Sequence, residues 1–234
     1  MAQDAFGGEE DRLGYNHVEI GKIHDEVDTI AKATAKAIED AMGTDIVQPM
    51  STMWYAPEAV EFFTEFKKTV EAAAGTLTEA FNGFITNVNN AQTAWSDKTG
   101  GGAKTEVQAI GNLSITIDIS SIKEEDNGSI MLYKSKALAH ADSLAAVQTR
   151  LTKAIADQKA ALENLNQAFL GGGQGAAVEH CFEVVLGVIA QIFDFLTKGQ
   201  NSLQEQIKAA AETYSKMAEE ITTGMNSATA GQSS

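Results

Sequence analysis

Five side chains in this sequence could bind a transition metal or, in the case of the cysteine, attack a substrate: His17, His24, His140, His180 and Cys181. None of the histidines has a glutamate three residues before it, so the Glu-x-x-His pairs of di-iron helical bundles are missing. On a helix, His17 and His24 stand two turns apart, and His180 and Cys181 point to adjacent faces. We therefore expect the histidines to be solvated or packing residues and the cysteine to be a small buried residue, with no bound metal or cofactor.

Signals for other kinds of catalysis are also missing from the sequence. It contains no Walker loop or dinucleotide fingerprint, and the run Gly100–Gly102 follows a predicted helix rather than a strand. Acidic residues such as Glu124–Asp126 fall in predicted loops and on polar faces, where they are solvated. Nothing resembles a nucleophile beside its base, so we predict no catalytic residues and a protein that is not an enzyme.

The composition favours a folded, acidic protein. Hydrophobic residues make up 44% of the chain, enough for a sizeable core, and the formal net charge is −15. Arginine occurs only at Arg12 and Arg150, so we expect no nucleic-acid partner and no electrostatic docking on an anionic membrane. The single cysteine excludes an intrachain disulfide, and the acidic start of the chain predicts no Sec-type signal peptide.

Apolar residues recur at helical spacing in four long stretches, which predicts four helices over about residues 16–42, 57–100, 131–169 and 175–225. The row of the second stretch is Phe62, Phe66, Val70, Ala73, Leu77, Phe81, Phe84, Val88 and Trp95. The row of the fourth stretch is Val178, Phe182, Val185, Ile189, Ile192, Leu196, Leu203, Ile207, Tyr214, Met217 and Ile221.

Local signals mark where these helices begin and end. Thr34 is the one polar residue in the row of the first helix, and Gly43 and Thr44 predict its end. Pro57 suits the first turn of the second helix, because the amide that proline lacks would be unpaired there. Gly199 and Asn201 predict a kink in the fourth helix.

The segment between the second and third helices differs in pattern. Leu113–Ile119 alternates apolar and polar residues, which is typical of a strand, but one short strand is not stable alone. We predict an irregular linker over residues 101–130 that holds a small hairpin or a strand laid against the helices. Residues 1–15 are predicted to be a flexible acidic N-terminus, and residues 226–234 a disordered tail.

The order of helices and breaks predicts an all-α fold. Short breaks make successive helices antiparallel neighbours, so residues 16–100 and 131–225 each form a helical hairpin. One hairpin alone exposes a full apolar face, and two hairpins can cover each other. The sequence therefore predicts an elongated four-helix bundle made of two tandem hairpins.

The first break carries a recognisable motif, Trp54-Tyr-Ala-Pro-Glu-Ala-Val-Glu-Phe62. It resembles the Trp-X-Gly hairpin signature of the ESAT-like family, the small substrates of type VII secretion systems. Trp54 and Phe62 match the signature, Ala59 fits its small position, and Ala56 stands where the family has glycine.

The second break resembles the same signature with the tryptophan lost. Gly175 occupies the glycine position, Ala177 a small position, and the aromatic residue arrives at Phe182, one residue late. The resemblance implies that the chain joins two hairpin units which other family members supply as separate polypeptides.

The family also carries an export signal, a tyrosine followed four positions on by an acidic residue, just after the second helix of a hairpin. In this sequence Tyr214 is followed by Glu219, five positions on. Tyr214 also fits the apolar row, so its alternative role is a half-buried core tyrosine.

Three functions are compatible with these patterns. The first is a secretion-linked protein that is made in the cytoplasm and exported without a Sec signal, as a substrate or as an adaptor or chaperone-like partner of type VII machinery or of a cognate secreted protein. The second is a membrane-active α-helical pore former, suggested by the apolar segment 182–196, whose alternative is a core helix. The third is a phage or other assembly component.

Overall fold

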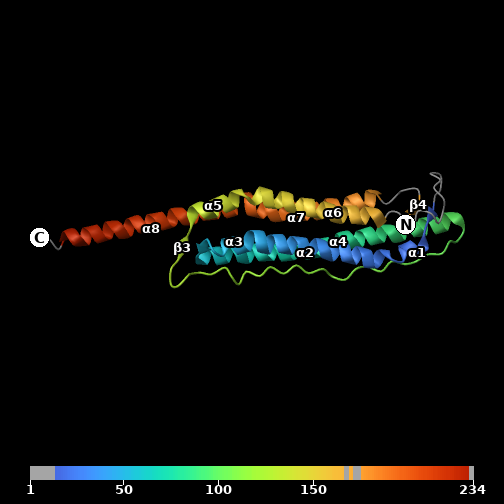
Figure 1. The fold of residues 1–234 in the computed structure, drawn as a ribbon, viewed down its shortest axis with the longest axis horizontal. Helices are drawn as coiled ribbons and strands as arrows, with labels where there is room; N and C mark the ends of the chain where they lie inside the picture. The colour runs from blue at the N-terminus through green and yellow to red at the C-terminus, as the bar shows by residue number, and fades with distance from the viewer. Residues whose placement is uncertain (1–13, 166–168, 171–174, 232–234) are drawn as a thin grey trace. The chain divides into compact units, whose positions relative to one another are not determined.

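The computed structural model describes residues 14–165, 169–170 and 175–231, and these are mostly helical. An all-α fold is thereby confirmed. The elements, labelled in Figure 1, are β1 (Gly14–Tyr15), α1 (His17–Ile20), α2 (Ile23–Met42), the π-helical turn η1 (Gly43–Val47), α3 (Gln48–Met50), β2 (Trp54–Tyr55), α4 (Pro57–Thr99), β3 (Met131–Leu132), α5 (Lys134–Asp142), α6 (Leu144–Asn164), β4 (Phe169–Leu170), α7 (Gly175–Thr197) and α8 (Leu203–Gly231).

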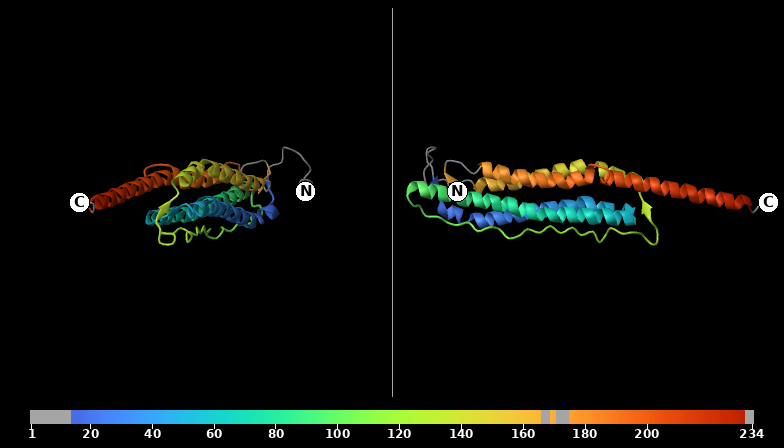
Figure 2. Two further views of the ribbon diagram at one scale, coloured as in Figure 1. Left: turned by 60° about the vertical axis from the view of Figure 1, so that its left-hand side comes forward. Right: turned by 180° about the vertical axis from the view of Figure 1, so that it is seen from behind.

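The chain forms two compact units, each assembled from three separate stretches of sequence. Unit 1 comprises Met1–Glu39, Glu71–Thr116 and Arg150–Ala190, and unit 2 comprises Asp40–Val70, Ile117–Thr149 and Gln191–Ser234. Helices α2, α4, α6 and α7 each begin in one unit and end in the other. The longest of them, α4, is uninterrupted in both views of Figure 2.

Helix α4 has the bounds that the sequence predicts. It begins at Pro57, with Glu58 in its first turn, and it ends at Thr99. Gly100 and Gly101 follow with φ of 79° and 106°, a left-handed backbone that glycine adopts without steric cost. Local signals are sufficient to predict both ends of α4, because Pro57 restricts the backbone at its start and Gly100 frees the backbone after its end.

The predicted end of the first helix at Gly43 is wrong. The chain continues from α2 through the π-helical turn η1 into α3, which ends at Met50. Ile46, Val47 and Met50 are all at most 2% exposed, so continuing the helical path buries three apolar side chains that a stop at Gly43 would expose.

The third and fourth predicted helices are each divided in two. Ser143 separates α5 from α6, and its hydroxyl donates to the His140 carbonyl over 2.7 Å. The kink predicted at Gly199 is a complete break between α7 and α8, with φ of 81° at that glycine. Helix α8 then continues to Gly231, although disorder is predicted from residue 226; residues 232–234 lie outside the described residues, as do residues 1–13 of the predicted flexible N-terminus.

The core of unit 1 follows the predicted apolar rows. On α2, Ile23, Val27 and Ile38 are at most 1% exposed. Thr34 is fully buried among them, and its hydroxyl has no hydrogen-bond partner among the described residues. Helices α4 and α7 meet at Phe81 and Phe182, whose rings pack edge to face with centroids 6.1 Å apart.

Residues 103–116, which we call the strap, precede and partly overlap the predicted strand over Leu113–Ile119. They are extended but pair with no strand among the described residues, and side chains of α4 bind their peptide groups instead. The three α4 amides that do so are Asn82, Asn89 and Gln92, and each accepts from the N–H and donates to the C=O of one strap residue. The pairs are Gln92 with Thr105 (2.9 and 2.8 Å), Asn89 with Val107 (3.0 and 2.9 Å) and Asn82 with Ile110 (2.8 and 3.4 Å).

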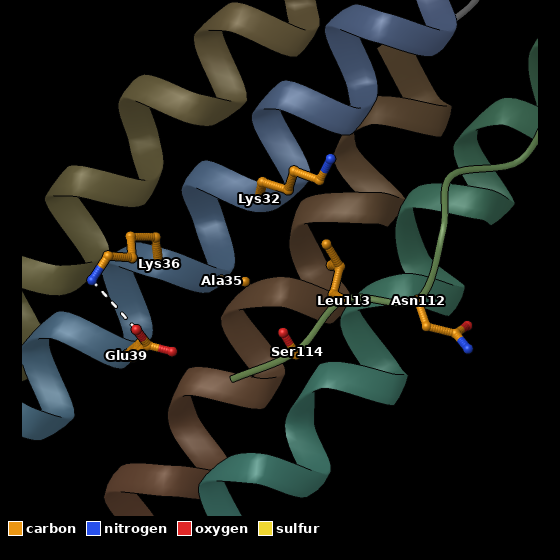
Figure 3. Close-up of a pocket in the computed structure, with 7 residues that line it drawn as sticks. All are labelled: Lys32, Ala35, Lys36, Glu39, Asn112, Leu113 and Ser114. Atoms are coloured by element: carbon orange, nitrogen blue, oxygen red, sulfur yellow. Dashed lines mark hydrogen bonds and ion pairs between the residues drawn. The ribbon is translucent and has the colours of Figure 1, made fainter. Parts of the chain in front are cut away.

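Helix α2 contacts the strap as well. His24 Nδ1 lies 2.9 Å from the Gln108 carbonyl oxygen, and Glu39 accepts from the Thr116 N–H over 2.9 Å. From the start to the end of the strap, the residue numbers of its α2 partners increase, from His24 to Glu39. Those of its α4 partners decrease, from Gln92 to Asn82. The two helices therefore run antiparallel in unit 1. A shallow hollow of about 270 Å³ lies between α2 and strap residues 112–114 (Figure 3).

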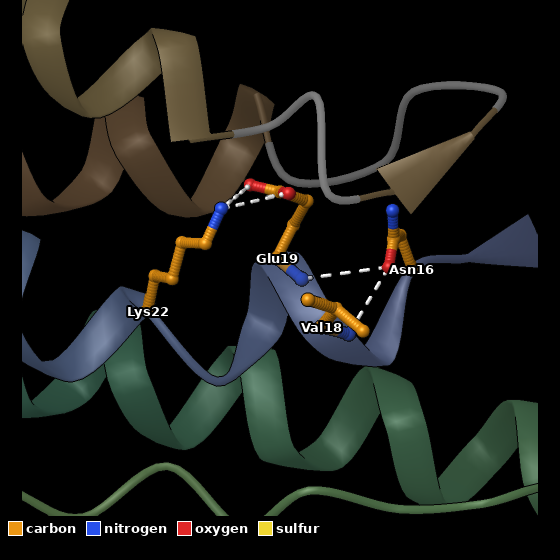
Figure 4. A network of polar contacts seen from close by, with 4 residues as sticks. All are labelled: Asn16, Val18, Glu19 and Lys22. Carbon is orange, nitrogen blue, oxygen red and sulfur yellow. Dashed lines mark hydrogen bonds and ion pairs between the residues drawn. The ribbon is translucent and has the colours of Figure 1, made fainter. Parts of the chain in front are cut away.

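The start of the described chain is held in unit 1 by a local cap and a short clasp. Asn16 Oδ1 accepts from the N–H groups of Val18 and Glu19 at the first turn of α1, and Lys22 pairs with Glu19 over 2.9 Å (Figure 4). Just before this cap, β1 pairs antiparallel with β4, and the Tyr15 hydroxyl donates to the Ala103 carbonyl of the strap.

The strap analysis predicts an asymmetry between two adjacent asparagines. Asn89→Leu leaves both peptide groups of Val107 without a partner, and we expect it to lower the free energy of unfolding by about 2–3 kcal/mol. Asn90→Leu, the same change at an exposed position, should alter it by less than about 0.5 kcal/mol. Urea denaturation of the two variants measures the difference, and equal stabilities would contradict this role of Asn89.

Candidate functional site at the Trp54 turn

The turn that carries the tryptophan motif lies in unit 2 and is fixed by backbone pairing. Strand β2 pairs antiparallel with β3, so that Trp54 lies opposite Leu132 and Tyr55 opposite Met131. The Tyr133 N–H donates to the Met53 carbonyl over 2.8 Å, and the Ala56 N–H donates to the Lys123 carbonyl over 3.1 Å. One residue of the linker, Lys123, and one that follows it, Tyr133, therefore hold the two ends of this turn.

The predicted motif residues of this turn are core residues. Trp54, Ala56 and Ala59 are fully buried, and Phe62 is 8% exposed. The Phe62 ring packs edge to face on Phe63 with centroids 5.2 Å apart. The motif stabilises the junction between α3 and α4 by packing, and Trp54 offers no surface to a partner.

Tyr214 of α8 contacts the same turn. Its hydroxyl donates to Glu58 Oε2 over 3.2 Å, joining residues 156 positions apart in the sequence. Burial is the main reason why the pKa of Tyr214 is raised, and the Glu58 carboxylate raises this pKa further. The Trp54 indole N–H lowers it. That indole N–H has no acceptor at hydrogen-bonding geometry among the described residues, so its contact with Tyr214 is weak.

A groove of about 630 Å³ opens beside this turn in unit 2. Phe62 and Phe195 contribute its apolar part, with ring centroids 5.5 Å apart. Glu58, Glu61 and Glu65 follow one face of α4 along the groove, and the other lining residues are Val60, Thr64, Asn201 and Gln206. An apolar floor beside carboxylates suits an apolar side chain flanked by positive charge. No pattern in the sequence indicated this groove, because its residues come from α4, α7, the break after α7 and the start of α8.

The second, degenerate motif lies in unit 1, so the two motif copies belong to different compact units. Gly175 is the exposed first residue of α7, Ala177 is half-buried, and Phe182 is 1% exposed against Phe81. Gly173 and Gln174, which directly precede this motif copy, lie outside the described residues.

The two residues of the predicted export signal have different surroundings. Tyr214 is half-buried against Glu58, as a packing residue would be, whereas Glu219 is exposed on α8. Between Glu212 and Met225 every described residue of α8 except Tyr214 is exposed, including Met217 at 54%, Ile221 at 63% and Met225 at 67%. This part of α8 is an exposed amphipathic helix.

The histidines and the cysteine are scattered over the described chain. His17 and His180 are exposed, His24 contacts the strap, and burial lowers the pKa of His140 despite the nearby Asp45. Within residues 14–165, 169–170 and 175–231, no three histidine, cysteine or carboxylate side chains group as a metal site would require. Cys181 is 2% exposed, and burial raises its pKa to about 12.

Comparisons with known proteins add no relative. No protein-family model, no curated protein and no solved structure matches the chain. One helix among the described residues, α7, is long and apolar enough to cross a membrane, with a mean hydropathy of 1.6 in its most apolar window. Of that window 44% is buried, and a core helix can have the same length and composition.

The Tyr214 contact predicts how stability changes in alkali. The pKa of Tyr214 is higher in the folded than in the unfolded chain, so its stabilising contribution is present below about pH 10 and is lost as the pH rises through the folded value. Tyr214→Phe should reduce the loss of stability above pH 10, measured by urea denaturation at a series of pH values. Tyr133→Phe, at a 48% exposed position, is the control and should retain the wild-type profile.

The environment of Cys181 predicts its reactivity. A thiol with a pKa of about 12 carries almost no thiolate near neutral pH, and its burial excludes reagents. We expect iodoacetamide to leave the native chain unmodified at about pH 8 and to alkylate it fully in urea, as followed by mass spectrometry. Rapid alkylation of the native chain would show that α7 is not packed as described.

Proposed function

We propose that this chain is a non-enzymatic protein linked to type VII secretion, acting as an exported substrate or as an adaptor or chaperone-like partner. In this proposal its fold is a four-helix bundle of two tandem ESAT-like hairpins. The observation that carries the proposal is the Trp54 turn, in which the tryptophan and Phe62 of the motif are buried at the junction of two helical segments. An acidic charge of −15 and the absence of catalytic motifs in the sequence are consistent with a protein that acts through its surfaces.

Two surfaces of unit 2 are available for such contacts. One is the groove with Phe62, Phe195 and the α4 carboxylates, and the other is the exposed part of α8 from Glu212 to Met225. We propose that the secretion machinery or a cognate secreted protein contacts α8, where Glu219 serves as the acidic residue of the export signal.

Export tests this proposal directly. In a host with a type VII system, we expect the chain to accumulate in the culture medium and to remain in the cells when the membrane ATPase of that system is inactivated. Glu219→Ala should also abolish accumulation, whereas Glu220→Ala, the same change at the exposed neighbouring position, should leave it unchanged. Export that persists without the ATPase would contradict the proposal.

A membrane-active protein is the second candidate, favoured by the length and hydropathy of α7 and by Leu186, which is 41% exposed on it. Dye release from liposomes distinguishes the two candidates. The secretion-linked protein should release no dye, whereas a pore former should release it in proportion to added protein and lose this activity with Leu186→Asp.

A further inference from the structure

The strap is bound mainly through its peptide groups rather than through its side chains. A primary amide carries an acceptor and a donor in one plane, so Asn82, Asn89 and Gln92 can each pair with one strap residue as a neighbouring strand would. Thr78 Oγ1 extends this row by accepting from the Leu113 N–H over 3.0 Å. Such hydrogen bonds require an extended backbone and are independent of the side chains that it carries.

The α4 residues that provide this row are themselves held in place. Gln92 is 2% exposed and Thr78 is 8% exposed, so neither side chain is a freely rotating surface group. With His24 and Glu39 of α2 on the other side, six side chains of unit 1 bind the backbone of strap residues 105–116. We call this set the strap site.

Only a few strap side chains are buried, and their spacing defines a pattern. Val107, Ile110 and Ile115 are 4–5% exposed, whereas Gln108, Ala109, Asn112 and Ser114 between them are exposed. The strap site therefore selects aliphatic residues at three positions and leaves the exposed positions between them unrestricted. Backbone pairing combined with a few buried apolar positions is how proteins recognise extended peptides.

The connection to α4 allows the strap to leave without disturbing the helix. Helix α4 ends at Thr99, and Gly100 and Gly101 with positive φ form the junction before the strap. Because the strap is tethered, its effective concentration at the site is on the order of millimolar, which would exclude a weaker external ligand until the strap is released.

We propose that the strap site is a binding site for an extended polypeptide, and that residues 103–116 occupy it as an exchangeable internal ligand. The external ligand is an extended segment with aliphatic side chains at the spacing of Val107, Ile110 and Ile115. Binding it displaces the strap and changes no secondary structure in α2 or α4. This inference is independent of the proposed role in secretion.

The test uses the full chain with its strap weakened and its strap site intact. In the variant Val107→Asp with Ile110→Asp, two carboxylates at buried positions expel the strap. The probe is a fluorescein-labelled synthetic peptide of residues 103–117, followed by fluorescence anisotropy. We expect the peptide to bind this variant at least about tenfold more tightly than it binds the wild type, whose own strap competes.

Two controls separate backbone recognition from general stickiness. Ala109→Asp with Asn112→Asp adds the same charge at exposed strap positions, and this variant should bind the peptide no better than the wild type. A peptide that is N-methylated at Val107 lacks the N–H that Asn89 accepts, so it should lose binding to the Val107→Asp, Ile110→Asp variant. Equal binding of the methylated and unmethylated peptides would overturn the proposal.

Failure to bind is informative as well. If the weakened variant keeps the wild-type circular dichroism but binds no peptide, the proposal is overturned. If that variant does not fold, hydrogen exchange of the wild type decides. The amides of Thr105, Val107 and Ile110 should then exchange together and faster than those of α4 between Thr78 and Gln92. Exchange of the strap only together with α4 would show that it is not exchangeable.

Discussion

Helix α4 is the element on which the rest of the structure depends, because it serves the core and the strap with adjacent faces. Its apolar row includes Phe66 and Val70 in unit 2 and Leu77, Phe81 and Val88 in unit 1, all fully buried. The amides that bind the strap lie beside this row, since positions 82, 89 and 92 follow one another at helical spacing. The same helix thus buries apolar area and satisfies the peptide groups of a segment that has no strand to pair with.

The parts of the fold that could be predicted from the sequence are those set by local chemistry. Pro57 and Gly100 fix the two ends of α4, and the helical rows identify the buried side chains of α2, α4 and α7. The break at Ser143 and the continuation past Gly43 could not be predicted, because a lone serine gives no distinct stop signal and the path past Gly43 depends on tertiary burial. Ser143 bonds a carbonyl one turn earlier, and Ile46 and Val47 are helical because that path buries them.

The alternation over Leu113–Ile119 illustrates why a pattern can be read correctly and still mislead. Ile115 and Ile117 are buried and the residues beside them are exposed, as a period of two requires. That period follows from an extended backbone and says nothing about its partner. Here the partners are the helical side chains Thr78, Glu39 and Lys67, and single polar residues of this kind give no signal that distinguishes them from solvated ones.

At the Trp54 turn the sequence located the motif but not its surroundings. Burial of Trp54 and Phe62 follows from their types, whereas the contact between Tyr214 and Glu58 joins distant segments that no periodicity relates. The groove beside the turn is likewise formed by segments that are distant in the sequence. A groove formed by three helices can be recognised only when they are placed in space.

Pairing through peptide groups also bears on how this chain can diverge. Each strap residue that faces solvent is free to vary, and the residues that pair with an amide must keep an N–H and an extended backbone, with an aliphatic side chain as well at Val107 and Ile110. The constraint falls on a few amides of α4 and on the avoidance of proline opposite them. Homologues can thus preserve this arrangement while losing almost all recognisable identity along the strap. A common origin would then be detectable in the structure after it is no longer detectable in the sequence.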